Sequence, residues 1–131
     1  MFDINPADGA PIWRQIEEGM RRMISLGTLE PGSGVPSVRE LAQHLRVNPN
    51  TVARAYQRLT DEGVLAVRRG EGTFVSDAPK QLRKSEKNEA LRDAAGRYAG
   101  TALAVGASLE DAQSELELSF ERVMREHRRK L

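Results

Sequence analysis

Side chains that can contact nucleic acid gather in one stretch of the sequence, residues 36–75. Arginine offers a planar fork of donors that fits phosphate oxygens and the edge of guanine, and asparagine can pair with adenine. Serine and threonine can donate a hydroxyl to bases or phosphates. The positive charge of the stretch is all arginine, six residues against four acidic ones, for a net charge of +2. The candidate contacts, with a proline and a glycine that shape the backbone between the donors, are Ser37, Arg39, Asn48, Pro49, Asn50, Thr51, Arg54, Arg58, Arg69 and Gly70.

Two short helices must position most of these side chains. Ser37 and Glu40 have the spacing of a capping box, which predicts a helix beginning just after Ser37. A turn at residues 46–48 separates it from a second helix, which Asn48 caps and Gly63 ends. Pro49 suits the first turn of that helix, where its missing N–H has no cost. Helical spacing places the buried faces of the two helices at Val38, Leu41, Leu45, Val52, Tyr56 and Leu59.

A hairpin follows the two helices. Strands are predicted at residues 64–67 and 73–75, and the loop at 68–72 contains two glycines that permit a tight turn. Two helices joined by a short turn, followed by a hairpin, make a winged helix-turn-helix. The second helix of such a unit can enter the DNA major groove. Arg69 and Gly70 at the tip of the wing suit a backbone or minor-groove contact.

A family resemblance rests on a dense set of motifs within residues 12–76. They are Leu29-Glu30-Pro31-Gly32, Pro36-Ser37-Val38-Arg39-Glu40-Leu41-Ala42, Val47-Asn48-Pro49-Asn50-Thr51-Val52, Ala55-Tyr56, Leu59 to Gly63, and Arg69-Gly70-Glu71-Gly72-Thr73-Phe74-Val75. With these motifs, about half of the chain resembles the winged helix-turn-helix of the GntR family of bacterial transcription regulators. The Asn-Pro-Asn-Thr-Val form, followed by Ala55-Tyr56, resembles the YtrA-type branch. The resemblance implies that Arg39 contacts DNA, that Arg69-Gly70 reaches the minor groove, and that a short helical tail forms a dimer.

Several of these residues have a structural interpretation beside the functional one. The caps of the two helices alone would explain Ser37 and Asn48. Arg58 can contact a phosphate or pair with Asp61 or Glu62, and the pattern does not decide whether Ala53 or Arg54 faces the groove. An acidic residue at the wing, Glu71, would repel phosphate.

The head is completed by a helix before this stretch. Residues 1–11 are expected to be extended, with a turn-rich stretch between Pro6 and Pro11. A helix is predicted from Pro11 to about Leu26, with Trp13 on its apolar stripe as a core or dimer-contact aromatic. Pro79 breaks the chain, and every lysine lies at or after position 80. We therefore expect a winged helix-turn-helix DNA-binding domain over residues 1–77 and a helical dimerisation domain over residues 78–131.

The tail is predicted to be a two-helix hairpin. Its helices are separated near Gly106, and Ser108 caps the second one. Each helix has one apolar stripe, which a second copy of the chain could cover; the alternative is that the helices fold back on their own head. The basic end at residues 125–130 is expected to be a solvated helix terminus. The predicted dimerisation residues are Leu91, Ala95, Tyr98, Ala102, Val105, Leu109, Ala112, Leu116, Phe120 and Val123.

Composition narrows the function further. The chain has 131 residues, a net charge of +1 and no cysteine, so disulfides and thiolate metal sites are excluded. No apolar run is long enough to span a membrane, and the amino-terminal residues lack the pattern of a signal peptide, which favours the cytoplasm. His44 and His127 lie in separate predicted elements, so we expect no metal, no cofactor and no enzyme activity.

The expected fold is mainly α with a small β-hairpin wing. The expected function is a transcription regulator, a repressor that binds an inverted-repeat operator in double-stranded DNA as a homodimer, with an unidentified small-molecule effector as a further candidate partner. A winged-helix module that binds a protein or senses a small ligand is the alternative. Glu71 and the low net charge are its only support.

Overall fold

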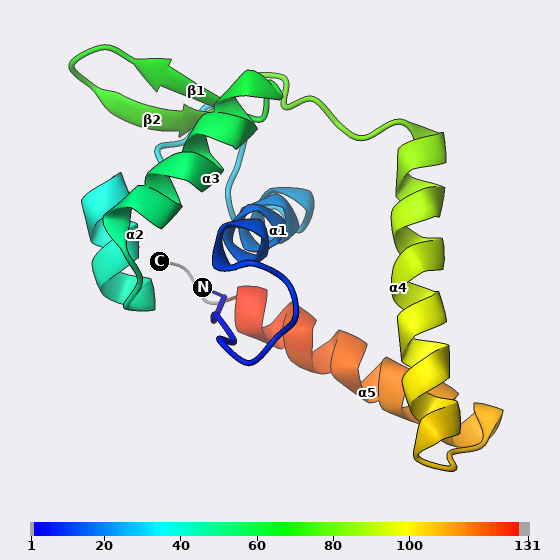
Figure 1. Cartoon of the computed structure of the whole chain (residues 1–131). Coiled ribbons are helices and arrows are strands. Elements are labelled where there is room, and N and C mark those ends of the chain that lie inside the picture. The colour runs from blue at the N-terminus through cyan, green and yellow to red at the C-terminus, as the bar shows by residue number, and fades with distance from the viewer. Residues whose placement is uncertain (1, 129–131) are drawn as a thin grey trace. The chain divides into compact units, whose positions relative to one another are not determined.

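The computed structural model describes residues 2–128, which form two compact units. The first unit comprises residues 2–80 and 126–128, and the second comprises residues 81–125. Within the described residues the elements follow one another (Figure 1) as α1 (Ile12–Ser25), α2 (Val38–Leu45), α3 (Pro49–Asp61), β1 (Leu65–Arg68), β2 (Gly72–Val75), α4 (Lys84–Ala104) and α5 (Leu109–His127). This is the predicted mainly helical fold with a two-stranded hairpin.

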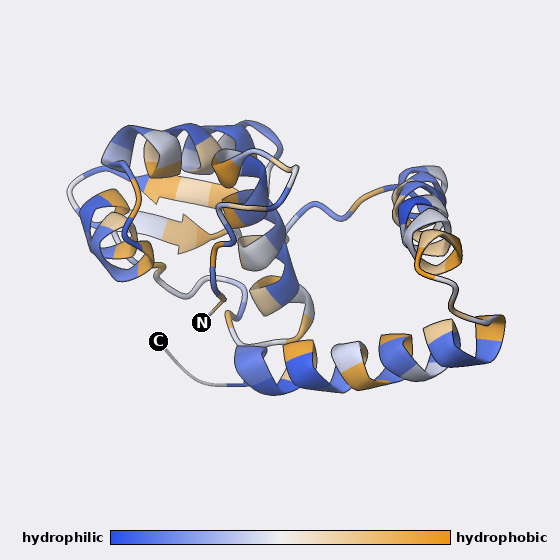
Figure 2. Cartoon of the chain, turned by 60° about the horizontal axis from the view of Figure 1, so that its bottom comes forward, coloured by the Kyte–Doolittle hydropathy of each residue, from blue (hydrophilic) through white to orange (hydrophobic). Residues whose placement is uncertain are grey.

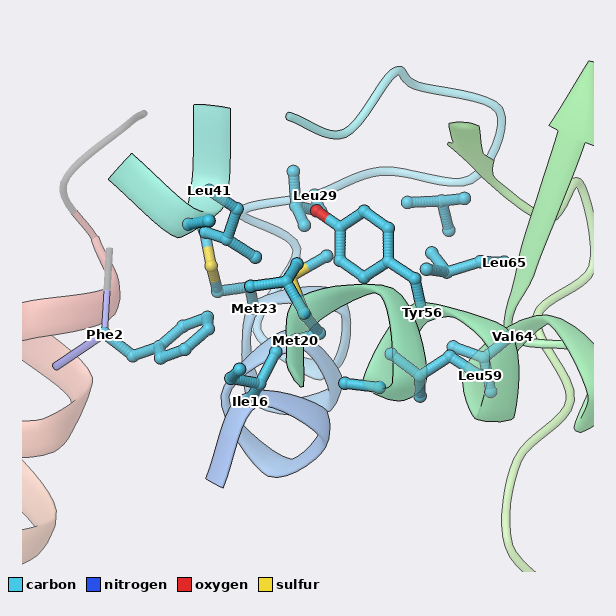
Figure 3. Packing of buried hydrophobic residues seen from close by; sticks show 14 residues of the cluster. Phe2, Ile16, Met20, Met23, Leu29, Leu41, Tyr56, Leu59, Val64 and Leu65 are labelled. Carbon is cyan, nitrogen blue, oxygen red and sulfur yellow. The ribbon is translucent and has the colours of Figure 1, made fainter. Parts of the chain in front are cut away.

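The core of the first unit lies where α3 packs against α1, α2 and β1. Ile16, Met20 and Met23 of α1 are completely buried there. Figure 3 shows Phe2 at one edge of this cluster and Val64 and Leu65 at the opposite edge. The helical spacing of the apolar residues therefore predicted the buried faces of these helices correctly. The side chains that complete the core are Leu29, Leu41, Ala42, Val52, Ala55, Tyr56, Leu59 and Val75.

The turn between α2 and α3 is fixed by side-chain caps. Ser37 Oγ accepts a hydrogen bond from the Glu40 N–H at 3.1 Å, and Glu40 Oε1 accepts one from the Ser37 N–H at 3.2 Å, so the predicted capping box is present. Arg46 ends α2 in the left-handed conformation, with φ of 59°. Asn48 Oδ1 then accepts from the Asn50 N–H at 2.8 Å and begins α3. These local bonds set the direction of α3 relative to α2.

Tyr56 holds the connector before α2 in place. Its hydroxyl donates to the carbonyl oxygen of Pro36 at 2.8 Å, so α3 is tied to the residue just before the cap of α2. Burial raises the pKa of Tyr56, and the charge of Glu40 raises it further. The phenol therefore stays protonated and remains a donor.

The wing is an antiparallel pair in the register Leu65↔Val75, Ala66↔Phe74, Val67↔Thr73 and Arg68↔Gly72. The first strand is displaced by one residue from its prediction, and the second begins one residue earlier and ends at Val75 as predicted. An isolated bridge between Gly34 and Phe74 adds the connector to the edge of the hairpin. The Val35 N–H donates to the Thr73 carbonyl oxygen at 3.0 Å and the Val75 N–H to the Ser33 carbonyl oxygen at 2.8 Å. The loop at residues 68–72 forms the tip of the projecting hairpin (Figure 1).

Both ends of the described chain pack on the first unit, which the sequence did not predict. Phe2 is buried and its ring stacks on that of His127, with the ring centroids 6.2 Å apart. Arg22 Nε donates to His127 Nε2 at 3.0 Å, and Thr28 Oγ1 donates to the His127 carbonyl oxygen at 2.6 Å. Burial lowers the pKa of His127, and the charge of Arg22 lowers it further, so the imidazole is held neutral.

This packing corrects the prediction for the carboxyl-terminal end at one residue, His127. The basic end at residues 125–130 was expected to be solvated, and Arg125 and Arg128 are exposed, but His127 between them is only 1% exposed; residues 129 and 130 lie outside the described residues. The turn-rich stretch expected between Pro6 and Pro11 is present, since residues 6–10 form turns and bends, and Gln15 Nε2 donates to the Asn5 carbonyl oxygen at 2.9 Å. The first unit includes Lys80, whose N–H donates to the Gly63 carbonyl oxygen at 3.2 Å.

Gly19 makes room for the Phe2 ring, because a Cβ at this position would overlap the ring carbons. We expect Gly19→Ala to displace Phe2 and to lower the free energy of unfolding by about 1–2 kcal/mol, the loss of buried aromatic area less the gain in helix propensity. In a Phe2→Ala background the same change should instead raise it by about 0.5–1 kcal/mol. Urea unfolding of the four proteins measures both values. An equal effect of Gly19→Ala in the two backgrounds would contradict this role of the glycine.

The second unit exposes its apolar side chains. Gly106, with φ of 76°, lies in the turn that follows α4. Ser108 caps α5, because its Oγ accepts a hydrogen bond from the Asp111 N–H at 3.1 Å. The Tyr98 hydroxyl donates to the Ala112 carbonyl oxygen at 2.8 Å, which joins the two helices near this turn. Figure 2 shows hydrophobic bands recurring along α5 between hydrophilic ones. Among the described residues, no helix is both long and apolar enough to cross a membrane.

Candidate nucleic-acid interface

Arg39 lies in the first turn of α2 and is exposed. Its acidic neighbour Glu40 is held by the capping box with Ser37. Arg39 itself makes no hydrogen bond or ion pair with another described residue. Arg39 is therefore not paired with its neighbour Glu40, and all its donors are available to a ligand.

The exposed face of α3 presents amide and guanidinium groups. Asn50, Ala53, Arg54 and Gln57 are exposed, and their spacing of three and four residues places them on one face. Val52, Ala55 and Tyr56 are buried on the other side, and Thr51 is half-buried between the two. Ala53 and Arg54 are both exposed, so burial does not separate these two candidates for the groove.

Gln57 is a candidate that the sequence analysis missed. It lies two helical turns after Asn50 on the same exposed face of α3, and that interval was the available signal. Its Nε2 donates to Asp61 Oδ1 at 2.9 Å, so one amide proton and the amide oxygen remain available for base recognition. Glutamine, like asparagine, can pair with adenine through both atoms of its amide.

Trp13, expected to be a core or dimer-contact aromatic, packs against the core but is not fully buried in it. It is half-buried at the edge of the core, and the guanidinium carbons of Arg54 and Arg58 lie over its ring, 4.9 Å and 4.5 Å from the ring centroid. Both distances are within the range of cation–π attraction. The indole therefore supports two side chains of α3 instead of filling the interior.

Arg58 is engaged in a network of ion pairs within the first unit. Its Nε lies 2.6 Å from Glu17 Oε1, and its guanidinium lies 4.0 Å from Glu62, which also pairs with Arg21. Of the two alternatives for Arg58, the structure favours the internal pair, and Glu17 of α1 is a stronger partner than either acid suggested by the sequence. Arg58 is thus neutralised where Arg54 is not.

The two arginines of the wing also differ in whether they have a partner. The guanidinium of Arg68 lies 4.1 Å from the centroid of the Phe74 ring and 3.9 Å from Asp77 Oδ1. Arg69 is exposed and has no hydrogen-bond or ion-pair partner among the described residues. Gly70 has a φ of 77°, a conformation that favours glycine, so the tip needs this residue for its shape.

Comparison with known proteins identifies what these elements belong to. The family described as bacterial regulatory proteins, gntR family, matches residues 13–75. The HTH-type transcriptional regulator Rv1152 of Mycobacterium tuberculosis is 36% identical over 108 residues, which cover 82% of this chain and 84% of that protein. The chain belongs to the GntR family.

Two further GntR comparisons bear on the site. The HTH-type transcriptional repressor YtrA of Bacillus subtilis (strain 168) is 42% identical over 80 residues, or 61% of this chain, and the match spans only 62% of the repressor's length. The DNA-binding domain of AraR, solved in complex with operator ORX1, superimposes with a TM-score of 0.52 and 29% identity, covering 58% of this chain and 93% of that one. The predicted GntR and YtrA-type resemblance is confirmed, and the chain is a DNA-binding transcriptional regulator of this family rather than an enzyme.

The GntR head exposes most of the predicted site residues. Arg39, Asn50, Arg54, Arg69 and Gly70 are exposed, and so are the capping residues Ser37 and Asn48 with Pro49 beside them. Thr51 is half-buried, and Arg58 is held by Glu17. The exposed members offer donors suited to phosphate and base edges. The described residues contain no group of three or more His, Asp or Glu side chains that could hold a metal ion.

Proposed function

We propose that this GntR-family regulator is a repressor that binds an inverted-repeat operator as a homodimer, with α3 in the major groove and the wing in the minor groove. The observation that carries the proposal is the exposed face of α3 at Asn50, Arg54 and Gln57, with the free guanidinium of Arg39 in the preceding helix. Phosphate contacts would supply most of the affinity, and Arg39, Asn50 and Thr51 would supply specificity. The operator complex of the AraR domain and the name of the YtrA repressor support this assignment.

The dimer is proposed to form through the second unit, so that residues 78–131 act as a dimerisation domain and residues 1–77 as the DNA-binding domain. The support is that α4 and α5 leave large apolar side chains in solvent, among them Leu91, Leu109, Leu116 and Phe120, each more than half exposed. Exposed apolar faces of this kind mark interaction sites. Beside the turn between α4 and α5 there is also a concavity of about 310 Å³, whose lining includes Tyr98, Ala102, Leu103 and Ala112.

A two-fold dimer would present two copies of α3 to successive turns of the duplex, about 34 Å apart. Each head would then read one half of an inverted repeat. Repression would follow if the operator overlaps a promoter, and the protein would act in the cytoplasm, where bacterial DNA is found.

The test is binding to the DNA upstream of the protein's own gene, compared with scrambled DNA of the same composition at two salt concentrations. We expect a preference of about a thousandfold or more, and an affinity that falls steeply with salt. Footprinting of the bound DNA should then reveal two half-sites related by two-fold symmetry. Failure to bind either DNA at low salt would overturn the proposed function and favour the protein-interaction module.

A further inference from the structure

We propose that Trp13 is a positioning residue for DNA recognition, which holds the guanidinium of Arg54 against its indole face and aims its donors outward from α3. The proposal rests on the proposed function, because it assigns α3 to the groove. Trp13 projects from α1, so it makes the first helix of the head contribute to the site without contacting DNA itself.

The two arginines over Trp13 differ in what else they touch. Arg58 is fixed at both ends of its guanidinium by Glu17 and Glu62, which neutralise it. Among the described residues, the Trp13 indole is the only partner of the Arg54 guanidinium. The Trp13 ring therefore packs against two arginines of different kinds. Arg58 belongs to a structural ion pair, whereas the charge of Arg54 is not compensated by any acidic side chain that the structure describes.

A stacking contact is suited to this role because of its geometry. Cation–π attraction uses the face of the guanidinium, whereas its five N–H donors lie in the plane and at the edge. Arg54 can therefore be held in position and still donate to a base or a phosphate. A salt bridge would occupy the same donors, as it does in Arg58. Holding the side chain in advance removes part of the entropy cost of ordering it when DNA binds.

The size of the effect follows from that cost. Immobilising one long side chain changes an affinity by roughly two- to tenfold. We expect Trp13→Leu, which keeps an apolar side chain against the core but has no aromatic face, to weaken operator binding by about three- to tenfold. Trp13→Phe, which keeps a face, should weaken it by about twofold or less. The urea midpoint of each variant checks that the head remains folded.

A double-mutant cycle separates positioning from a general effect on the fold. In an Arg54→Ala background Trp13→Leu should cause no further loss of operator affinity, because the side chain that it positions is absent. A loss of the same size in both backgrounds would overturn the proposal, and so would equal behaviour of Trp13→Phe and Trp13→Leu. If Trp13→Leu does not fold, Arg54→Lys tests the same contact, because it keeps the charge but removes the planar stack. We expect Arg54→Lys to weaken operator binding by the same amount, about three- to tenfold. Operator binding equal to that of the wild type would overturn the positioning role of Trp13.

The contact can also be measured without DNA. Trp13 is the single tryptophan of the chain, so the intrinsic tryptophan fluorescence reports on this site alone. Arg54→Ala should shift the Trp13 emission of the free protein, and an unchanged spectrum would show that the stack is not populated. If the wild-type protein binds no DNA while this shift is present, the proposed function fails and the DNA role of Trp13 fails with it. If the wild type binds DNA and the cycle is additive, only the positioning role fails.

Discussion

Arg39→Ala is expected to remove operator preference while leaving the dimer and the fold intact. Arg39 is exposed, has no internal partner among the described residues and lies at the first turn of α2, so its loss has little structural cost. A bidentate arginine contact to a base contributes about 1–3 kcal/mol, which is roughly 5- to 150-fold in operator affinity. The measurement is a titration of the operator and of scrambled DNA with the wild type and the variant.

The matched control is Arg97→Ala, which removes the same charge from the exposed surface of α4. It should lower both affinities slightly and equally, because only the long-range field changes. Equal losses of operator affinity for Arg39→Ala and Arg97→Ala would show that Arg39 contributes only its long-range charge. Retained preference in Arg39→Ala would remove this residue from the site.

The salt dependence of DNA affinity then distinguishes a contact of Arg39 with a base from a contact with a phosphate. If it reads a base, affinity for the operator falls and affinity for scrambled DNA changes little. If it binds a phosphate, affinity should fall uniformly across sequences and the slope of log affinity against log salt should decrease by about 1. The second pattern would leave specificity to Asn50, Thr51 and Gln57 of α3.

The sequence predicted the helix-turn-helix well because its determinants are local. The capping box of Ser37 and Glu40, and the Asn48-Pro49 start of α3, specify helix ends within a few residues of themselves. The periodicity of apolar residues then placed the buried faces correctly. Strand ends were displaced by one residue, since hydrogen bonding in the hairpin extends to Arg68 and Gly72, positions where the sequence shows only turn residues.

The errors concern contacts between residues that are distant in the chain. Trp13 was assigned to the core because it lies on the apolar stripe of α1, and nothing in the stripe indicates that Arg54 and Arg58 cover its ring. Phe2 and His127 are single residues in polar ends of the chain, and periodicity cannot detect them. The Phe2 ring packs in the space left by the missing side chain of Gly19. A single glycine in a predicted helix does not indicate that an aromatic ring packs against it.

A single charge on the apolar face of α5 should dissociate the proposed dimer, and most of the operator affinity should be lost as a result. Phe120 is 66% exposed, so Phe120→Glu removes little packing from the free chain. In a dimer the same carboxylate would be buried without a partner, which is strongly unfavourable. We expect the variant to be monomeric in sedimentation equilibrium and to bind the full operator at least about a hundredfold more weakly, since each head then binds without the effective concentration that the second head provides.

Leu118→Glu is the matched control, because Leu118 is a 58% exposed apolar residue on the same helix but off the predicted stripe. It should remain dimeric and bind the operator as the wild type does. An isolated half-site provides the decisive comparison, because Phe120→Glu should bind it as well as wild type if only the coupling between the heads is lost. A variant that is still dimeric would place the interface elsewhere. A monomer that still binds the full operator tightly would mean that each head reads its site independently, and an inverted repeat would then have no physical reason to be required.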